Sequence, residues 1–461
     1  MEQITAQSYQ WSVFKKMTFR FAFIFFILFI LCLDWSVNPV LSYLFYEGYL
    51  AELLDGAVQW TGKNLFHIPY TIISPYDGQH NDRTYIYLLY FIMAAAAVLG
   101  TVVWSMLDRR KANYDILYYW LTTVLRYYLA FTLFLFALEK FFKVQFPDLD
   151  LYTLTQTVGD MSPMSLAWTF FGYSYGYNIF MGIAESAALL LLFRRTMTFG
   201  AILTIFTLAN VMAVNYNYDV HAKMYPTALL VMTLFLLLPS IHSLFKFFFT
   251  GQPTSLPVIQ APVSKKRWVN YSKTALKILV IGCTLVFILN DYADYKNQLI
   301  ASELSKAQSG LSGVYDISSF VRNQDTLSSG DPMRWQEIII GGARERIRLQ
   351  GDSIAFLNVS EDNHEILVHG DRLSLGIKEQ EIYNELGLTI STYDNMDSIM
   401  VAQQAKSRLQ FELTDSVTLK LKGKIKNDSV FVIAIKRPVT FKDFRLMKRD
   451  FHWINEVVYM Y

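Results

Sequence analysis

The stretch RYYLAFTLFLFALEK, residues 126–140, decides how this chain folds. Every residue from Tyr127 to Leu138 is aromatic, aliphatic or threonine, and charged residues stand at both ends. The hydrocarbon core of a bilayer is ~30 Å thick and takes a helix of ~20 mostly apolar residues. A charge at that depth costs a few kcal/mol or more, so it usually faces other helices and finds a partner. The stretch therefore predicts a membrane-spanning helix whose ionisable side chains point into a bundle.

Similar stretches recur through the first 291 residues. Of the 461 residues, 53% are hydrophobic and 17% are charged, which is too apolar for an ordinary soluble protein of this length. The first stretch ends at Asp34 and Trp35 rather than at a small-residue cleavage site, so we read it as a retained span. We expect seven spans, at residues 16–37, 85–107, 115–143, 172–193, 198–216, 226–249 and 273–291.

Basic residues predict the orientation of the spans. If every span crosses, four basic clusters fall on one side, and that side is expected to be cytoplasmic. The N-terminus then lies inside the cytoplasm and the C-terminus lies outside it. Lys plus Arg (41) nearly balances Asp plus Glu (39), so nothing indicates a nucleic-acid partner. The clusters are Lys15, Lys16 and Arg20; Arg109, Arg110 and Lys111; Arg194 and Arg195; Lys265, Lys266 and Arg267.

Four domains follow from this pattern. Residues 1–250 form a helical membrane domain with six spans, and residues 251–272 form a proline-containing cytoplasmic linker. The seventh span covers 273–291, and a β-rich periplasmic domain covers 292–461. Residues 38–62 carry apolar side chains at helical spacing, which fits either a helix on the outer membrane face or a packed external helix.

The periplasmic domain opens with a short helix at 300–308 and continues in runs with period-two alternation. Short strands separated by polar turns predict an antiparallel barrel or sandwich. Gly313 and Tyr315 begin the first strand after a helix, as in lipocalins, so a lipocalin-like barrel is one of the possible folds. The runs are Val314–Arg322, Trp335–Ile340, Arg344–Leu349, Ser353–Val359, Glu365–Val368, Leu388–Thr392, Ser398–Ala402, Leu409–Leu413, Val417–Lys422 and Ser429–Arg437.

Span four carries the clearest polar stripe. Tyr175, Asn178, Gly182 and Glu185 are spaced by three, four and three residues, so they share one face of a helix. Gly182 on that face permits close approach of a second helix. Glu185 is therefore expected to point into the bundle, where it needs a cation or its own proton.

Three cations are available to Glu185: Arg126, Lys140 and Lys223. Lys223 lies in a polar break between spans five and six, together with Asn215, Asp219 and His221. We expect these residues to meet around one internal chamber, with Glu185 and Lys223 as candidate catalytic groups and the others as ligand contacts. Such a network could lock helix register, bind a polar headgroup such as a quinone ring or lipid phosphate, or carry out proton-coupled chemistry. No His, Cys and carboxylate spacing fits a zinc or haem site.

Four groups of motifs resemble the DoxX-like membrane proteins, over about residues 85–250. The resemblance implies an inner-membrane four-helix core, here residues 115–250, and a redox-associated role. Some DoxX-like proteins are subunits of a thiosulfate:quinone oxidoreductase. The layout is also similar to the vitamin K-dependent carboxylase-like membrane domain, which pairs a helical core with a β-rich domain. The motifs are Arg126-Tyr-Tyr-Leu-Ala with Glu139 to Pro147, Met161-Ser-Pro-Met with Trp168 to Gly172, Arg194-Arg-Thr with Gly200, and Asn215 to Lys223.

Three functions are open at this point. In the first, the helical pocket binds quinone or a similar amphiphile, and Tyr175, Asn178, Glu185 and Lys223 contact its polar ring. In the second, the helices are a non-enzymatic anchor and assembly platform, and residues 300–461 bind a periplasmic partner or lipid. In the third, a carboxylase-like enzyme modifies a periplasmic peptide with Lys223 or His221 as base.

Overall fold

The computed structural model describes residues 10–33, 49–69, 72, 82–258, 267–308, 310–341, 345–349, 354–360, 365–369, 407–425 and 428–448. The chain divides into two compact units. The helical unit comprises Met1–Pro147 and Ser162–Asp294, and the β unit comprises Asp148–Met161 and Tyr295–Tyr461. The β unit is thus discontinuous in sequence, because it includes a segment between spans three and four.

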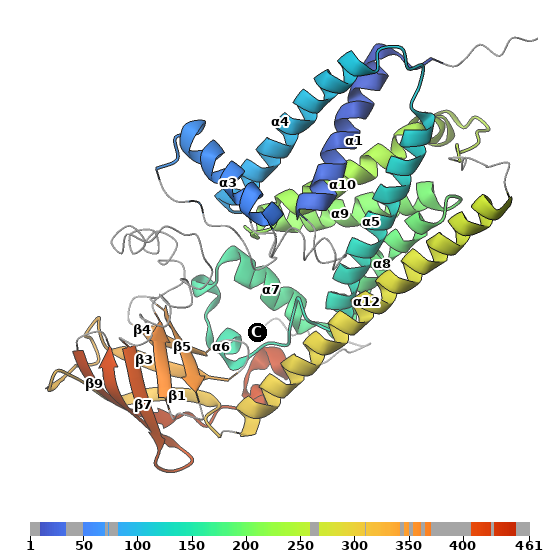
Figure 1. Ribbon diagram of the computed structural model, residues 1–461. Coiled ribbons are helices and arrows are strands. Elements are labelled where there is room, and N and C mark those ends of the chain that lie inside the picture. The colour runs from blue at the N-terminus through green and yellow to red at the C-terminus, as the bar shows by residue number, and fades with distance from the viewer. Residues whose placement is uncertain are drawn as a thin grey trace, which may run out of the picture. The chain divides into compact units, whose positions relative to one another are not determined.

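Within the described residues, six helices are long and apolar enough to cross a membrane, and each matches an expected span to within a few residues (Figure 1). Residues 34–37 of the first expected span lie outside the described part of the chain. The six are α1 (Val13–Leu33), α4 (Thr84–Leu107), α5 (Asp115–Phe141), α8 with a 3₁₀ turn η2 (Tyr175–Ser186, Ala187–Leu192), α9 (Met197–Asn217), and α10 with its extension (Met224–Leu237, continued to Thr250).

The seventh expected span falls inside α12 (Arg267–Gln308), which is not among the six. The count of seven therefore stays a prediction. The separate helix expected at 300–308 is instead the end of α12, which is continuous for 42 residues, or about 63 Å at 1.5 Å per residue. Its sequence contains no proline that would end the helix between these two parts.

Helix α5 is at the centre of the helical unit and packs against α1, α8, η2 and α10. Leu125, Leu129 and Leu133 recur every fourth residue on its buried side and are at most 1% exposed. The Tyr128 hydroxyl lies 3.0 Å from the Tyr225 hydroxyl of α10. In a bilayer such contacts stabilise a bundle through close packing and interhelical hydrogen bonds.

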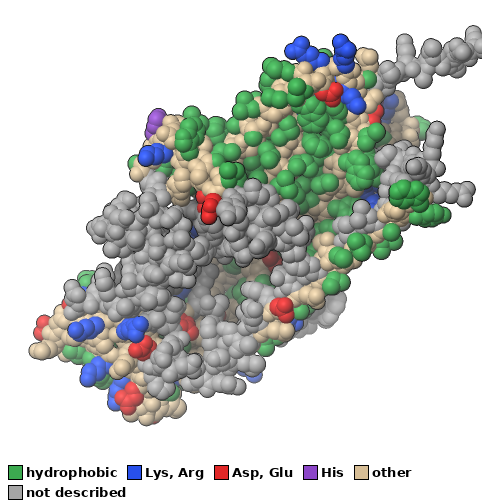
Figure 2. Space-filling view, viewed as in Figure 1, with side chains coloured by type: hydrophobic (Ala, Val, Ile, Leu, Met, Phe, Trp, Pro, Cys, Tyr) green, Lys and Arg blue, Asp and Glu red, His purple; other side chains and the backbone are tan. Residues whose placement is uncertain are grey.

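Hydrophobic side chains cover the face of the helical unit over α1 and α4 that Figure 2 shows. Exposed hydrophobic residues of these two helices include Phe14, Leu99 and Leu107. Helix α3 (Tyr49–Asn64) accounts for the described part of the helix expected at 38–62. It buries Val58 and contacts α4, while Leu53 and Trp60 are 67% and 64% exposed. An exposed leucine and tryptophan on one helix fit the expected helix at a membrane interface.

The β unit contains nine described strands in one antiparallel sheet, as the sequence predicts. The order β1-β3-β4-β5-β6-β7-β8-β9 follows the chain, β9 pairs back onto β1, and β2 extends the β1 hairpin. The pairings therefore form a closed ring. The expected strands at 388–392 and 398–402 lie outside the described residues. The strands are Gly313–Arg322, Asp325–Thr326, Trp335–Ile340, Glu345–Leu349, Ile354–Ser360, Glu365–His369, Ser407–Leu413, Thr418–Ile425 and Asp428–Lys436.

Alternating side chains fill the inside of this curled sheet. Ile338, Ile347, Leu421 and Val432 are fully buried, and they pair across neighbouring strands as Ile338 with Ile347 and Leu421 with Val432. Tyr315 is also fully buried, and its hydroxyl donates to the Leu311 carbonyl at 2.7 Å. The alternation along these strands therefore directs one set of side chains to the inside of the curled sheet.

The segment 148–161 packs on the sheet within the β unit. Its short helix α6 (Leu151–Thr155) begins at Asp150, whose carboxylate accepts the Thr153 N–H at 2.9 Å. Tyr152 packs with Val314 and Ile339, and the Arg346 guanidinium lies 3.9 Å from the centre of its ring. The sequence gives no sign of this docking, because five residues are too few to show a helical period.

Candidate functional site

The most deeply buried ion pair among the described residues joins two helices of the bundle. Lys140 Nζ, on the last turn of α5, lies 2.9 Å from Glu185 Oε1 on α8. The two side chains are 7% and 3% exposed. Burying both charges is costly, and their mutual attraction offsets that cost only while both partners are present. Lys140 is thus the cation that Glu185 needs.

Two oxygens on the same face of α8 keep unused hydrogen-bonding capacity. Glu185 Oε2 and Asn178 Oδ1 are buried, and neither accepts a hydrogen bond from any residue that the structure describes. The Asn178 amide nitrogen donates to the Phe171 and Ser174 carbonyls, at 2.6 and 2.9 Å, and so joins α7 (Pro163–Tyr173) to α8. Buried acceptors without a donor cost free energy and often mark a site where another molecule or a proton is bound.

Of the other two residues of the expected stripe, Gly182 lies on the buried face of α8 and Tyr175 does not. Gly182 is buried against the ring of Phe141, where an added Cβ would lie only 2.6 Å from a ring carbon. Its lack of a side chain is therefore what lets α5 approach α8 next to the ion pair. Tyr175, in contrast, is 55% exposed and does not share the buried face of Asn178 and Glu185.

Arg126 has partners of a different kind. It is 1% exposed, and its guanidinium donates to the carbonyls of Leu191 and Leu192, both at 2.6 Å. These carbonyls belong to the 3₁₀ turn that ends span four. The last carbonyls of a helix have no partner within the helix, and an arginine fork can satisfy two of them. Arg126 is therefore bonded to a helix end rather than to Glu185.

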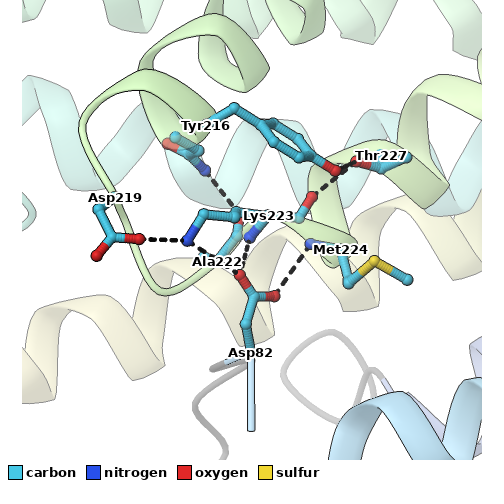
Figure 3. A network of polar contacts seen from close by, with 8 residues as sticks. Asp82, Tyr216, Asp219, Ala222, Lys223, Met224 and Thr227 are labelled. Carbon is cyan, nitrogen blue, oxygen red and sulfur yellow. Dashed lines mark hydrogen bonds and ion pairs between the residues drawn. The ribbon is translucent and has the colours of Figure 1, made fainter.

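Lys223 belongs to a third network, at the turn between α9 and α10 (Figure 3). Its Nζ donates to Asp219 Oδ1 at 2.9 Å and lies 4.0 Å from Asp82 Oδ2. Asp82 accepts the backbone N–H groups of Lys223 and Met224, at 2.6 and 3.1 Å. It thereby caps the start of α10 from a distant part of the sequence.

Asn215 and His221 complete this turn. The Asn215 amide donates to the Ala222 carbonyl at 2.7 Å, and the His221 carbonyl accepts the Asp82 N–H at 2.9 Å. The His221 side chain is exposed. The candidate residues are thus distributed over three networks rather than one chamber. Six of the candidate residues have no described contact to Glu185, so their roles in ligand binding stay predictions. They are Arg126, Tyr175, Asn215, Asp219, His221 and Lys223.

The ion pair between Asp219 and Lys223 bears on the idea of a lysine base. The hydrogen bond from Lys223 lowers the pKa of the Asp219 carboxyl, and the same bond raises the pKa of Lys223. A lysine that acts as a general base has to be deprotonated, and therefore neutral, at the working pH. A lysine with a raised pKa stays protonated, so this arrangement disfavours a carboxylase-like reaction that uses Lys223 as base.

Asp82 and Arg20 are two structural residues that sequence reasoning missed. Asp82 lies in an expected outer loop, where no periodic pattern indicates its role. Arg20 counts toward a basic cluster, yet it is 4% exposed and donates to the Tyr114 hydroxyl and to Ser105 Oγ, both at 2.6 Å. No three His, Cys, Asp or Glu side chains gather as a possible metal site in the described part of the chain.

Replacing Asp82 by alanine is expected to destabilise the start of α10 by about 1–2 kcal/mol, because two backbone donors lose their acceptor. Asp82→Asn keeps one amide oxygen and should lose less. Hydrogen exchange at the Lys223 and Met224 amides measures the effect directly. Unchanged protection of both amides in Asp82→Ala would contradict the capping role.

The turn at Asp219 should depend on pH. Its pKa in the folded chain lies below the value of about 3.9 for an unfolded Asp. The contact therefore stabilises the fold above about pH 4, and this contribution is lost as the pH falls through the lowered folded pKa. Protection of the Val220 amide, corrected for its intrinsic exchange rate, should fall with acid in the natural protein and change little in Asp219→Asn. Parallel curves for the two proteins would refute this.

Comparison with known proteins gives one relative that bears on family. The chain is 37% identical over 113 residues to the uncharacterized protein YwoB of Bacillus subtilis (strain 168), a match that covers 24% of this chain and 71% of that protein. The chain belongs to the YwoB family. No family model and no solved structure matches the chain. The YwoB family therefore accounts for about a quarter of the chain, and function has to be argued from the site.

Proposed function

We propose that this protein is a DoxX-like component of a bacterial inner membrane that binds a quinone-like amphiphile beside the Lys140–Glu185 pair. In this proposal the chain crosses the membrane seven times, the N-terminus is cytoplasmic, and the β unit is periplasmic. The six apolar helices and their hydrophobic outer surface support a membrane protein.

One observation carries the choice of ligand site. Glu185 is almost completely buried, its Oε1 is paired with Lys140, and its Oε2 accepts no hydrogen bond from the described residues. Arg126, by comparison, is bonded to the carbonyls of a helix end, and Lys223 is paired with Asp219. A polar headgroup on an apolar tail would reach an intramembrane site through lipid, and a hydroxyl on that headgroup would donate the hydrogen bond that Oε2 lacks. The ammonium would donate to a ring oxygen, the carboxylate would accept from a ring hydroxyl, and the ligand when bound would supply the redox chemistry.

The test is the amount of quinone that copurifies with the full chain in mild detergent. Lys140→Met combined with Glu185→Leu removes the charges and keeps the volume, so we expect it to fold and to lose the bound quinone. Lys420→Met with Glu412→Leu is the matched control, because these residues pair across β7 and β8 of the sheet. Natural protein without quinone, or equal quinone in the variant without the ion pair, would refute the proposal.

A second candidate, an assembly platform, is favoured by the surface of the β unit. Lys420, Lys422 and Lys424 alternate along β8; Lys420 lies opposite Glu412, and Lys422 and Lys424 form no ion pair with a described residue. Such a row suits an acidic partner. If the protein is an assembly platform, deletion of residues 300–461 should have the same cellular effect as loss of the whole protein. Loss of the Lys140–Glu185 pair alone should have no cellular effect. The reverse pattern would exclude the platform.

A further inference from the structure

The ion pair offers both kinds of hydrogen-bonding group side by side. An ammonium has three N–H donors, and the contact with Glu185 Oε1 uses one of those of Lys140. Lys140 Nζ also lies 5.4 Å from the centre of the Phe136 ring, which is a weaker cation–π contact. Glu185 Oε2 is an acceptor that no described donor meets. A bound group therefore encounters a donor and a charged acceptor together.

The two redox forms of a quinone differ in what they can do at such a site. A quinone has carbonyl oxygens, which only accept hydrogen bonds. A hydroquinone has hydroxyl groups, and a hydroxyl both donates and accepts. The hydroxyl can accept from Lys140 and donate to Glu185 Oε2, whereas a carbonyl leaves Oε2 without a donor in a water-poor interior. An acceptor that stays unfilled retains its full desolvation cost.

We infer that the Lys140–Glu185 site selects the reduced, dihydroxy form of its ligand over the oxidised form. This inference rests on the proposed function, because it presumes that a quinone-like molecule binds beside the pair. The reduced form makes one hydrogen bond to a charged acceptor that the oxidised form cannot make. The reduced form is therefore expected to bind about ten- to a hundredfold more tightly than the oxidised form. Selection of this kind concerns binding alone and requires no electron transfer within the protein.

The experiment uses the full chain in nanodiscs whose lipids contain no quinone. The probes are a decyl-substituted benzoquinone and its hydroquinone, which is kept reduced with excess dithionite under nitrogen. Dissociation constants for both forms come from titration calorimetry. We expect the hydroquinone to bind at least about tenfold more tightly to the natural protein. Equal or weaker binding of the hydroquinone overturns the inference and leaves the proposed function standing, whereas absence of binding by both forms overturns both.

Glu185→Gln sharpens the experiment. The amide keeps one oxygen for Lys140 and places an N–H₂ donor where Oε2 was, so the preference should shift toward the quinone by at least about tenfold. Glu412→Gln, the same change at an exposed position of β7, should leave the ratio unchanged. A Glu185→Gln protein that keeps the original ratio contradicts the role of Oε2. Should that variant fail to fold, the ratio in the natural protein still decides.

Discussion

The Glu185→Leu variant is expected to lose about 3–5 kcal/mol of unfolding free energy, because Lys140 would stay buried without its counter-ion. The expectation follows from the 2.9 Å contact and the near-complete burial of both side chains. Lys140→Met alone leaves the carboxylate unpaired and should be similarly unstable. Denaturant unfolding of each purified variant in detergent measures both losses.

The matched control is the double variant Lys140→Met with Glu185→Leu. Replacing a buried ion pair by apolar side chains of similar volume is often neutral, so the double variant should be far more stable than either single variant. A double variant whose loss equals the sum of the two single losses would show that the charges do not interact.

Arg126→Met is expected to destabilise the helical unit by about 2–5 kcal/mol, the second large effect. The substitution removes two short hydrogen bonds and leaves the Leu191 and Leu192 carbonyls buried without a donor. Methionine keeps much of the volume, so the loss reports on hydrogen bonding rather than on a cavity. Thermal unfolding in detergent and exchange of the amides in η2 measure it.

Arg126→Lys is the informative control for this prediction. Lysine keeps the charge but lacks the planar fork, so it can reach one carbonyl well and should recover only part of the stability. Full recovery would indicate that the charge, rather than the paired geometry, is what matters at this helix end.

The sequence predicts the elements of this protein better than their contacts. Long apolar stretches locate six helices, and period-two alternation locates every described strand except the two-residue β2, because both signals depend on a few neighbouring residues. Burial of Asn178 and Glu185 also follows from spacing along α8. Tyr175 shares that spacing, but it stands at the first turn of α8, where the side chain is exposed.

The partners of the charges could not be predicted in the same way. Choosing Lys140 over Arg126 for Glu185 requires the position of α8 along the axis of α5, which depends on tertiary packing around Gly182 and Phe141. The carbonyls that Arg126 binds are backbone groups, which have no signature in the sequence. Capping of α10 by Asp82 joins residues 141 positions apart, beyond any local pattern.

Infrared spectroscopy can show whether Glu185 Oε2, which accepts no hydrogen bond from the described residues, meets the headgroup of a bound amphiphile. The measurement is the isotope-edited difference spectrum of carbon-13 glutamate-labelled protein in nanodiscs, recorded on addition of the decyl hydroquinone. We expect a shift of a carboxylate band that is absent from Glu185→Gln and retained in Glu412→Gln. A spectrum without any glutamate band change at saturating hydroquinone, or a change that persists in Glu185→Gln, would contradict it.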